Sequence, residues 1–172
     1  YYTDSAAAGT ALACGVSTYN GAIALGPKKE AVLTCMEQAF QSGMRTGLVT
    51  STRLTHATPA CFATHIDDRS KELEIAQQLV SCHVNLLIGG GSDKFFVEQD
   101  LSKEINQQKI RLLKTATNIE HLQSNGRLDE RVLAFAASSH LPYMIDRNDA
   151  DEPAFPTLVD LTKGALSFLS NS

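Results

Sequence analysis

Residues 84–91 read Val-Asn-Leu-Leu-Ile-Gly-Gly-Gly, a mostly apolar run that ends in three glycines. Val84 to Ile88 predicts a buried strand, and the glycines predict a tight turn at its end. The turn is not a phosphate-binding loop of the Gly-Lys-Ser/Thr type, because no such residues follow it. The stretch before it, Ser70 to Ser81, has apolar residues at helical spacing and predicts an amphipathic helix.

The same alternation of helix and strand continues outward in both directions. Further strands are predicted at Thr46 to Thr50, Ile110 to Leu113 and Arg131 to Ala136. Helices are predicted after Ser5, from Thr58-Pro59, and over Glu30 to Gln41, Asp100 to Gln108, Asn118 to Gln123 and Thr157 to Leu169. Loops are predicted at Tyr19 to Lys29 and Ser138 to Phe155. This pattern predicts an α/β fold, with a parallel sheet that is covered by helices on both faces.

Length and composition are those of one α/β domain over residues 1–172, since 43% of the residues are apolar and can form a core. The net charge of −4 argues against a nucleic-acid partner. No apolar run reaches the length of a membrane span. The chain opens at Tyr1 without the charged start and apolar core of a signal peptide, so in an exported protein that segment would lie outside this sequence.

Cysteine usage argues against a structural zinc site, because no Cys-x-x-Cys pair occurs. Apolar neighbours predict that the cysteines are small buried hydrophobic residues: Cys14, Cys35, Cys61 and Cys82. A disulfide stays open as an alternative, and its pairing is not decided by the sequence. The cysteines therefore do not fix the redox compartment.

The first candidate for chemistry lies in residues 3–11, Thr-Asp-Ser-Ala-Ala-Ala-Gly-Thr-Ala. The alanines favour a helix, which places Ser5 at a predicted helix start. Unpaired N–H groups and the positive end of the helix dipole favour an anion such as phosphate beside it. The alternative is that Ser5 is a plain N-cap, since Ser and Asp are both preferred cap residues.

Two long blocks then resemble one known family. The continuation at residues 15–23 is Gly-Val-Ser-Thr-Tyr-Asn-Gly-Ala-Ile, and residues 47–60 are Gly-Leu-Val-Thr-Ser-Thr-Arg-Leu-Thr-His-Ala-Thr-Pro-Ala. Residues 3–23 resemble the nucleophile segment of the alkaline phosphatases, and residues 47–60 resemble that family's Thr-His-Ala-Thr/Ser-Pro-Ala segment. The resemblance implies that Ser5 is the nucleophile that becomes phosphorylated. Segments 86–91, 138–143 and 156–165 also resemble the family, and we assign them no chemistry.

In the second block the resemblance implies a magnesium ligand. Thr58 stands where the family supplies a hydroxyl oxygen to Mg²⁺, an ion that prefers hard oxygen donors. Thr58 also suits an N-cap before Pro59, and the two roles can coexist. His56 stands where some family members carry Asp, so the identity of the third metal stays open. His56 either binds metal itself or lies beside the metal's ligands.

Residues 65–69, His-Ile-Asp-Asp-Arg, resemble the family segment whose arginine clamps the phosphate. The planar fork of Arg69 suits two phosphate oxygens at once. The resemblance implies that Asp4 orients this arginine. Thr64 replaces the family's alanine, a departure that does not touch Arg69. Without the resemblance, an arginine after two aspartates is usually a solvated surface residue.

The resemblance covers nearly all of this chain but only part of the family's length, and most of the family's zinc ligands have no counterpart. Ser5 alone corresponds to a zinc ligand. We therefore expect an internal fragment of a larger catalytic domain that is inactive by itself. The whole protein is expected to hydrolyse phosphate monoesters, with two zinc ions and magnesium as cofactors and inorganic phosphate as product.

A periplasmic or secreted location and a homodimer are also implied by the resemblance. Two alternatives to this function stay open. One is a non-catalytic anion-binding fragment, and the other is a related enzyme that acts on phosphodiesters or sulfate esters.

Overall fold

Four parallel strands form the sheet of this protein. The computed structural model describes residues 2–114, 119, 122–124, 127, 129–146 and 155–170. The strands pair in the order β1-β2-β4-β3, and every pairing is parallel. The predicted α/β fold is therefore confirmed. The strands are β1 (Gly47–Arg53), β2 (Leu86–Gly90), β3 (Arg111–Leu113) and β4 (Val132–Ala137).

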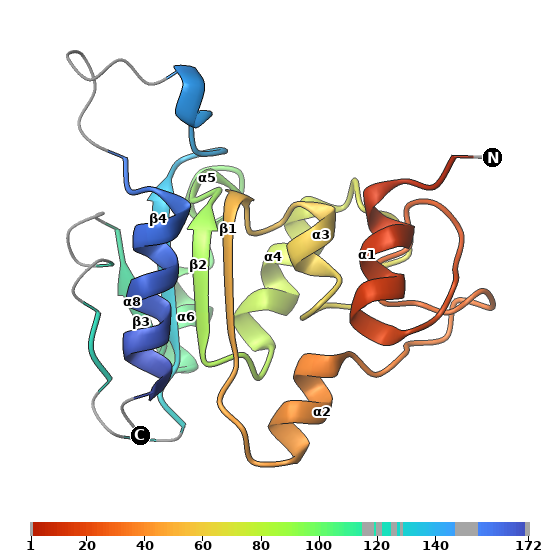
Figure 1. Ribbon diagram of the computed structural model, residues 1–172, viewed down its shortest axis with the longest axis horizontal. Helices are drawn as coiled ribbons and strands as arrows, with labels where there is room; N and C mark the ends of the chain where they lie inside the picture. Colours follow the sequence, from red (N-terminus) through yellow and green to blue (C-terminus); the bar gives the residue numbers. More distant parts are fainter. Residues whose placement is uncertain are drawn as a thin grey trace.

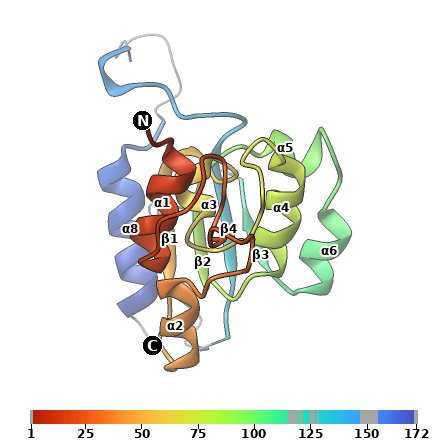
Figure 2. The same ribbon diagram turned by 90° about the vertical axis from the view of Figure 1, so that its right-hand side faces the viewer.

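Helices cover both faces of the sheet, also as predicted. Figures 1 and 2 show α8 on one face and α3, α4 and α6 on the other, with α1 packed outside α3. The helices are α1 (Ser5–Cys14), α2 (Cys35–Gln41), α3 (Ala57–Ala60), α4 (Glu72–Ser81), α5 (Asp93–Phe96), α6 (Ser102–Gln107) and α8 (Leu158–Ser170).

The core has two parts because successive strand residues point to opposite faces. Leu86 and Ile88 of β2 lie in one apolar cluster with Phe168 of α8. Leu87, between them, lies in the other cluster with Ile75 of α4. All residues of β2 are buried, as expected for a strand that is covered on both sides.

The main difference from the predicted elements is in the second helix. We predicted it from Glu30, but α2 begins at Cys35. Thr34 and Glu37 form a capping box: the Glu37 backbone N–H donates to Thr34 Oγ1 at 3.1 Å, and the Thr34 N–H donates to Glu37 Oε2 at 2.8 Å. The box fixes the helix start, and the preceding Ala31 forms an antiparallel bridge with Leu25 instead.

Two short elements were not predicted, α5 and the 3₁₀ helix Met144–Asp146. The latter lies in the segment that we predicted as a loop from Ser138 to Phe155, part of which is outside the described residues. The predicted helix over Asn118 to Gln123 also lies partly outside them.

The cysteines differ in burial. All four thiols are free, so the disulfide alternative finds no support. Cys61 is fully buried, as predicted, whereas Cys14 and Cys82 are half-buried. The prediction of burial was wrong for Cys35, which is exposed because it starts the partly solvated helix α2.

The three-glycine turn allows two other segments to approach the end of β2. A Cβ atom on Gly90 would lie 1.9 Å from the Ser139 carbonyl oxygen, and one on Gly91 would lie 2.9 Å from Arg53 Cβ. Gly91 also has a positive φ of 96°. The Leu54 N–H donates to the Gly90 carbonyl, and the Gly91 N–H donates to the Ala137 carbonyl, both at 3.0 Å. The turn thus joins the ends of β1, β2 and β4.

We expect Gly90→Ala to destabilise the fold by about 3 kcal/mol, because the Ser139 carbonyl belongs to backbone and cannot rotate away. Gly43→Ala is the matched control: Gly43 has a positive φ of 77° but open space around its Cβ position, so only backbone strain of about 1–2 kcal/mol applies. Urea unfolding compares the two variants. Equal losses would show that the contact with Ser139 relaxes without cost.

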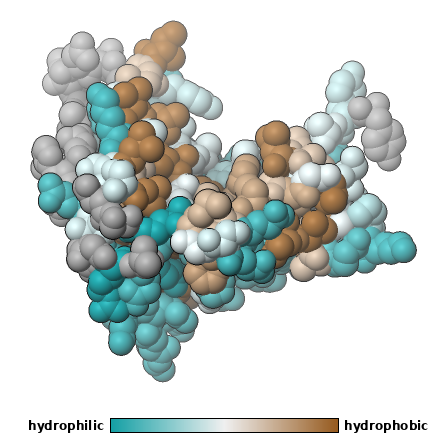
Figure 3. All heavy atoms as spheres, turned by 60° about the horizontal axis from the view of Figure 1, so that its bottom comes forward, coloured by the Kyte–Doolittle hydropathy of each residue, from teal (hydrophilic) through white to brown (hydrophobic). Residues whose placement is uncertain are grey.

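One side of the molecule is hollowed beside the edge strand β1. A cavity of about 500 Å³ lies there, with Met36, Leu48 and Phe62 in its lining. Figure 3 shows the hollow between the two arms of the molecule, with apolar surface on both arms. Exposed apolar side chains of the flanking helices include Leu12 of α1 and Leu166 of α8. In the described part of the chain, no helix is long and apolar enough to cross a membrane.

Candidate active site

The N-terminus of α1 is built around Asp4. Asp4 is the N-cap: its Oδ1 accepts from the Ala7 N–H at 2.9 Å, and its Oδ2 accepts from the Gly21 N–H at 3.1 Å. The alternative that Ser5 is the N-cap was therefore wrong, because Asp4 takes that position. Ser5 is the first helical residue, and its hydroxyl is not used for capping.

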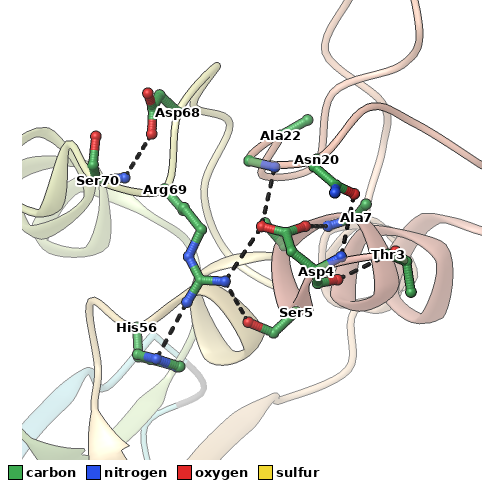
Figure 4. Close-up of polar contacts among 12 residues, drawn as sticks. Thr3, Asp4, Ser5, Ala7, Asn20, Ala22, His56, Asp68, Arg69 and Ser70 are labelled. Carbon is green, nitrogen blue, oxygen red and sulfur yellow. Dashed lines mark hydrogen bonds and ion pairs between the residues drawn. The ribbon is translucent and has the colours of Figure 1, made fainter. Parts of the chain in front are cut away.

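Arg69 joins the predicted site residues. Its Nη1 donates to Ser5 Oγ at 2.6 Å and to Asp4 Oδ2 at 3.3 Å, and its Nη2 lies 3.3 Å from His56 Nε2. Figure 4 shows the guanidinium between these three side chains. The Arg69 backbone N–H donates to the Gly21 carbonyl at 2.8 Å, so the arginine is bound to the loop that Asp4 also contacts. Arg69 is thus held in place and is not a freely solvated residue.

The charges of the site follow from these contacts. Burial would raise the pKa of Asp4, but the hydrogen bonds from Ala7, Gly21 and Arg69 outweigh burial and lower it. Burial, followed by the charge of Arg69, lowers the pKa of His56. Asp4 is therefore an anion near neutral pH, and His56 is neutral. Because arginine has donors only, His56 Nε2 accepts the hydrogen bond from Arg69.

Thr58 lies next to α1, since a Cβ atom on Gly9 would come within 3.5 Å of Thr58 Cα. It is inside the first turn of α3, whose N-cap position is taken by His56, so the predicted capping role of Thr58 was wrong. Thr58 lines the cavity beside β1 together with Thr50, Thr52 and His56. Thr58 is exposed at this cavity.

The donor chemistry does not complete a metal site. Among the described residues, no group of three or more His, Cys, Asp or Glu side chains lies close enough together to hold a metal ion. Ser5 and Thr58 each offer one hydroxyl, and His56 Nε2 already accepts from Arg69. A catalytic zinc usually takes three protein ligands, and Mg²⁺ is usually bound through carboxylates. The residues present therefore fit neither ion on their own.

The arrangement is suited to an oxyanion. The Arg69 guanidinium contacts the Ser5 hydroxyl at the N-terminus of α1, and Arg69 and Asp4 keep 30% and 26% of their side chains exposed. An anionic group entering from solvent can therefore reach Arg69 and the Ser5 hydroxyl together. Fold and site define a parallel α/β protein with a serine–arginine contact at a helix N-terminus.

Comparison with known proteins identifies the family. The family model described as alkaline phosphatase matches residues 2–172, and the chain belongs to the alkaline phosphatase family. It is 33% identical to a repressible alkaline phosphatase of Saccharomyces cerevisiae and 34% identical to alkaline phosphatase 4 of Bacillus subtilis, over 98% and 99% of this chain. These alignments cover 34% and 36% of the two relatives, so the chain spans about a third of their length.

Solved structures agree with this assignment. A cold-active alkaline phosphatase from Shewanella superposes with a TM-score of 0.85 at 34% identity, over 99% of this chain and 40% of that one. The enzyme from the Antarctic bacterium TAB5 gives 0.84 at 29% identity, over 98% and 48% of the chains. A mutant of that enzyme is described with Mg bound in its M3 site.

Sequence reasoning missed two residues beside the site, Arg53 and His140. The His140 ring lies edge-on to the His56 ring, with centroids 5.6 Å apart. Arg53 forms a bidentate ion pair with Glu72, with Nε to Oε2 at 2.9 Å and Nη2 to Oε1 at 2.7 Å. Arg53 is the last residue of β1, and His140 lies three residues after the end of β4, at the edge of the sheet where ligands bind in parallel sheets. That position was the signal that would have found them.

Because Arg53 and Glu72 form an ion pair, we expect part of the free energy of unfolding to be lost at acid pH. Burial would raise the pKa of Glu72, but hydrogen bonds from Arg53 and Thr55 lower it. A carboxylate with a lowered pKa stabilises the fold above its unfolded pKa of about 4.3, and this contribution is lost as the pH falls through the folded value. We expect Glu72→Gln to lower the free energy of unfolding by about 1.5–3 kcal/mol at pH 7. The loss should become smaller as the pH falls below about 4.

Urea unfolding between pH 7 and pH 3 measures this difference. Glu74→Gln is the control, since Glu74 lies in the same helical turn but is exposed. A Glu72→Gln deficit that stays constant over the whole pH range would contradict the assigned role of the carboxylate.

Proposed function

We propose that the protein to which this chain belongs hydrolyses phosphate monoesters through a phosphoserine at Ser5. The observation that carries the proposal is the contact of 2.6 Å between Arg69 Nη1 and Ser5 Oγ at the N-terminus of α1. Membership of the alkaline phosphatase family supports it.

In the proposed reaction Arg69 pairs with two non-bridging phosphate oxygens, and the α1 N-terminus faces the same anion. Ser5 Oγ attacks phosphorus, the bond from phosphorus to the ester oxygen breaks, and the alcohol leaves. A water molecule then cleaves the phosphoserine and releases inorganic phosphate, which restores the Ser5 hydroxyl. Asp4 holds Arg69 in place throughout, because its Oδ2 accepts from Nη1.

Two zinc ions and magnesium are part of the proposal. When bound, such ions supply Lewis-acid stabilisation of oxygen atoms around phosphorus. Ser5 would contribute one oxygen to zinc and Thr58 one to magnesium, with His56 at or beside the magnesium. The remaining ligands would have to come from outside the described residues, since these do not form a complete site. The chain alone is accordingly expected to be inactive.

A periplasmic or secreted location and a homodimer complete the proposal and rest on the family alone.

The test uses the natural full-length protein with zinc and magnesium and a ³²P-labelled phosphate monoester. We expect turnover, and label bound covalently to Ser5 after quenching at low pH, since phosphoserine is stable in acid. Hydrolysis of a phosphodiester or sulfate ester in preference to the monoester would overturn the proposed substrate class. Phosphate binding without turnover would favour the non-catalytic alternative.

A further inference from the structure

We infer that Arg53 and His140 are positioning residues for Arg69, acting through the ring of His56. The inference deepens the proposed function and rests on it for the identity of the bound phosphate. It starts from four side chains, each of which contacts the next: Glu72, Arg53, His140 and His56. These are called the positioning relay below. The relay ends at Arg69, which contacts Ser5.

The first link fixes the Arg53 guanidinium. Glu72 of α4 holds it with two hydrogen bonds, and Thr55 Oγ1 donates to the same carboxylate at 2.5 Å. The side chains of Arg53 and Glu72 are 22% and 19% exposed, so the pair is largely withdrawn from solvent. A bidentate pair of this kind sets both the position and the plane of the guanidinium.

The second link fixes the His140 ring. The Arg53 backbone N–H donates to His140 Nδ1 at 3.1 Å, and Arg53 Nη1 lies 2.6 Å from His140 Nε2. A neutral imidazole accepts through one ring nitrogen only, so one of these two contacts is a hydrogen bond to the ring and the other is a close approach. Both contacts come from Arg53, so the His140 ring lies directly against this residue.

The third link transfers this geometry to the oxyanion site. The His140 ring meets the His56 ring edge-on, at an interplanar angle of 76°. This is a favourable arrangement of two rings, and it restricts rotation of the His56 ring. His56 Nε2 then accepts from Arg69 Nη2 on the side of the guanidinium away from Ser5 and Asp4 (Figure 4). Arg69 is thereby held from both sides.

The three-glycine turn explains why the relay forms at this place. Gly90 leaves room for the Ser139 carbonyl, directly before His140, and Gly91 leaves room for the side chain of Arg53. The Asp93 N–H donates to the Ser138 carbonyl at 3.2 Å, which secures the same segment from the start of α5. The turn, to which we assigned no chemistry in the sequence analysis, therefore brings together Arg53 and His140, the two residues next to His56 in the relay.

The test is a double-mutant cycle on the full-length protein, with the inhibition constant of inorganic phosphate as the readout. His140→Ala is expected to weaken phosphate binding about fivefold in the wild-type background and less than about twofold in an Arg69→Ala background. Arg53→Lys keeps the charge but loses the fork, and we expect it to change binding in the same direction. His83→Ala is the matched control, because its exposed ring stacks on Phe40.

A second readout does not depend on catalysis. The ¹⁵N signals of the His56 ring, recorded at one pH by NMR, are expected to shift in His140→Ala and to stay in place in His83→Ala. Unchanged His56 signals, or equal weakening of phosphate binding in both backgrounds, would overturn the relay. If the wild-type protein forms no phosphoserine, the proposed function fails, and the NMR result still decides the structural coupling.

Discussion

Replacing Ser5 by alanine is expected to remove the phosphoenzyme and to lower turnover by roughly three orders of magnitude or more, as loss of a catalytic nucleophile does. The hydroxyl is the group that Arg69 contacts at 2.6 Å, and it is not used to cap α1. The fold should persist, because Asp4 carries the capping contacts to Ala7 and Gly21. A slow residual rate is compatible with direct attack of water on phosphorus.

Acid quenching with a labelled substrate measures this prediction, alongside steady-state turnover and a thermal unfolding midpoint. Ser17→Ala is the control, since Ser17 is an exposed serine in the loop that follows α1. Label that remains bound to the Ser5→Ala protein would refute the assignment of Ser5. A lowered unfolding midpoint together with lost turnover would point to a structural effect instead.

The sequence predicted the sheet and most of the helices well because those elements depend on local patterns. Leu86 to Ile88 is apolar on both faces, and its burial follows from this alone. The start of α2 was wrong because a capping box at Thr34 and Glu37 stops the apolar periodicity from extending back to Glu30. Such a box is readable in the sequence and outweighs helical spacing.

The site was predicted residue by residue, and of its connections only the one between Asp4 and Arg69 was expected. Asp4, Ser5, His56 and Arg69 came from the resemblance, and the structure brings all four together. Arg53 and His140 are 87 residues apart, and no periodicity or propensity relates such positions. Their contact depends on the Gly90 backbone and on strand order, which are properties of the folded chain.

Replacing Arg69 by alanine is expected to weaken binding of inorganic phosphate by about ten- to hundredfold, the equivalent of about 1.5–3 kcal/mol for a lost charge-assisted contact. The effect on stability should be small, because Asp4 keeps its hydrogen bonds from Ala7 and Gly21 and remains partly solvated. Arg69→Lys separates charge from geometry: it keeps the cation but cannot contact Ser5, Asp4 and His56 at once.

Inhibition by phosphate ranks these variants, and the expected order of affinity is wild type, then Arg69→Lys, then Arg69→Ala. Arg127→Ala serves as the control, since that arginine pairs with Asp129 on the surface. Equal inhibition constants for the wild type and Arg69→Ala would show that Arg69 does not take part in phosphate binding. Full recovery in Arg69→Lys would show that positive charge alone binds the anion, and that the fork held between Asp4 and His56 contributes nothing to recognition.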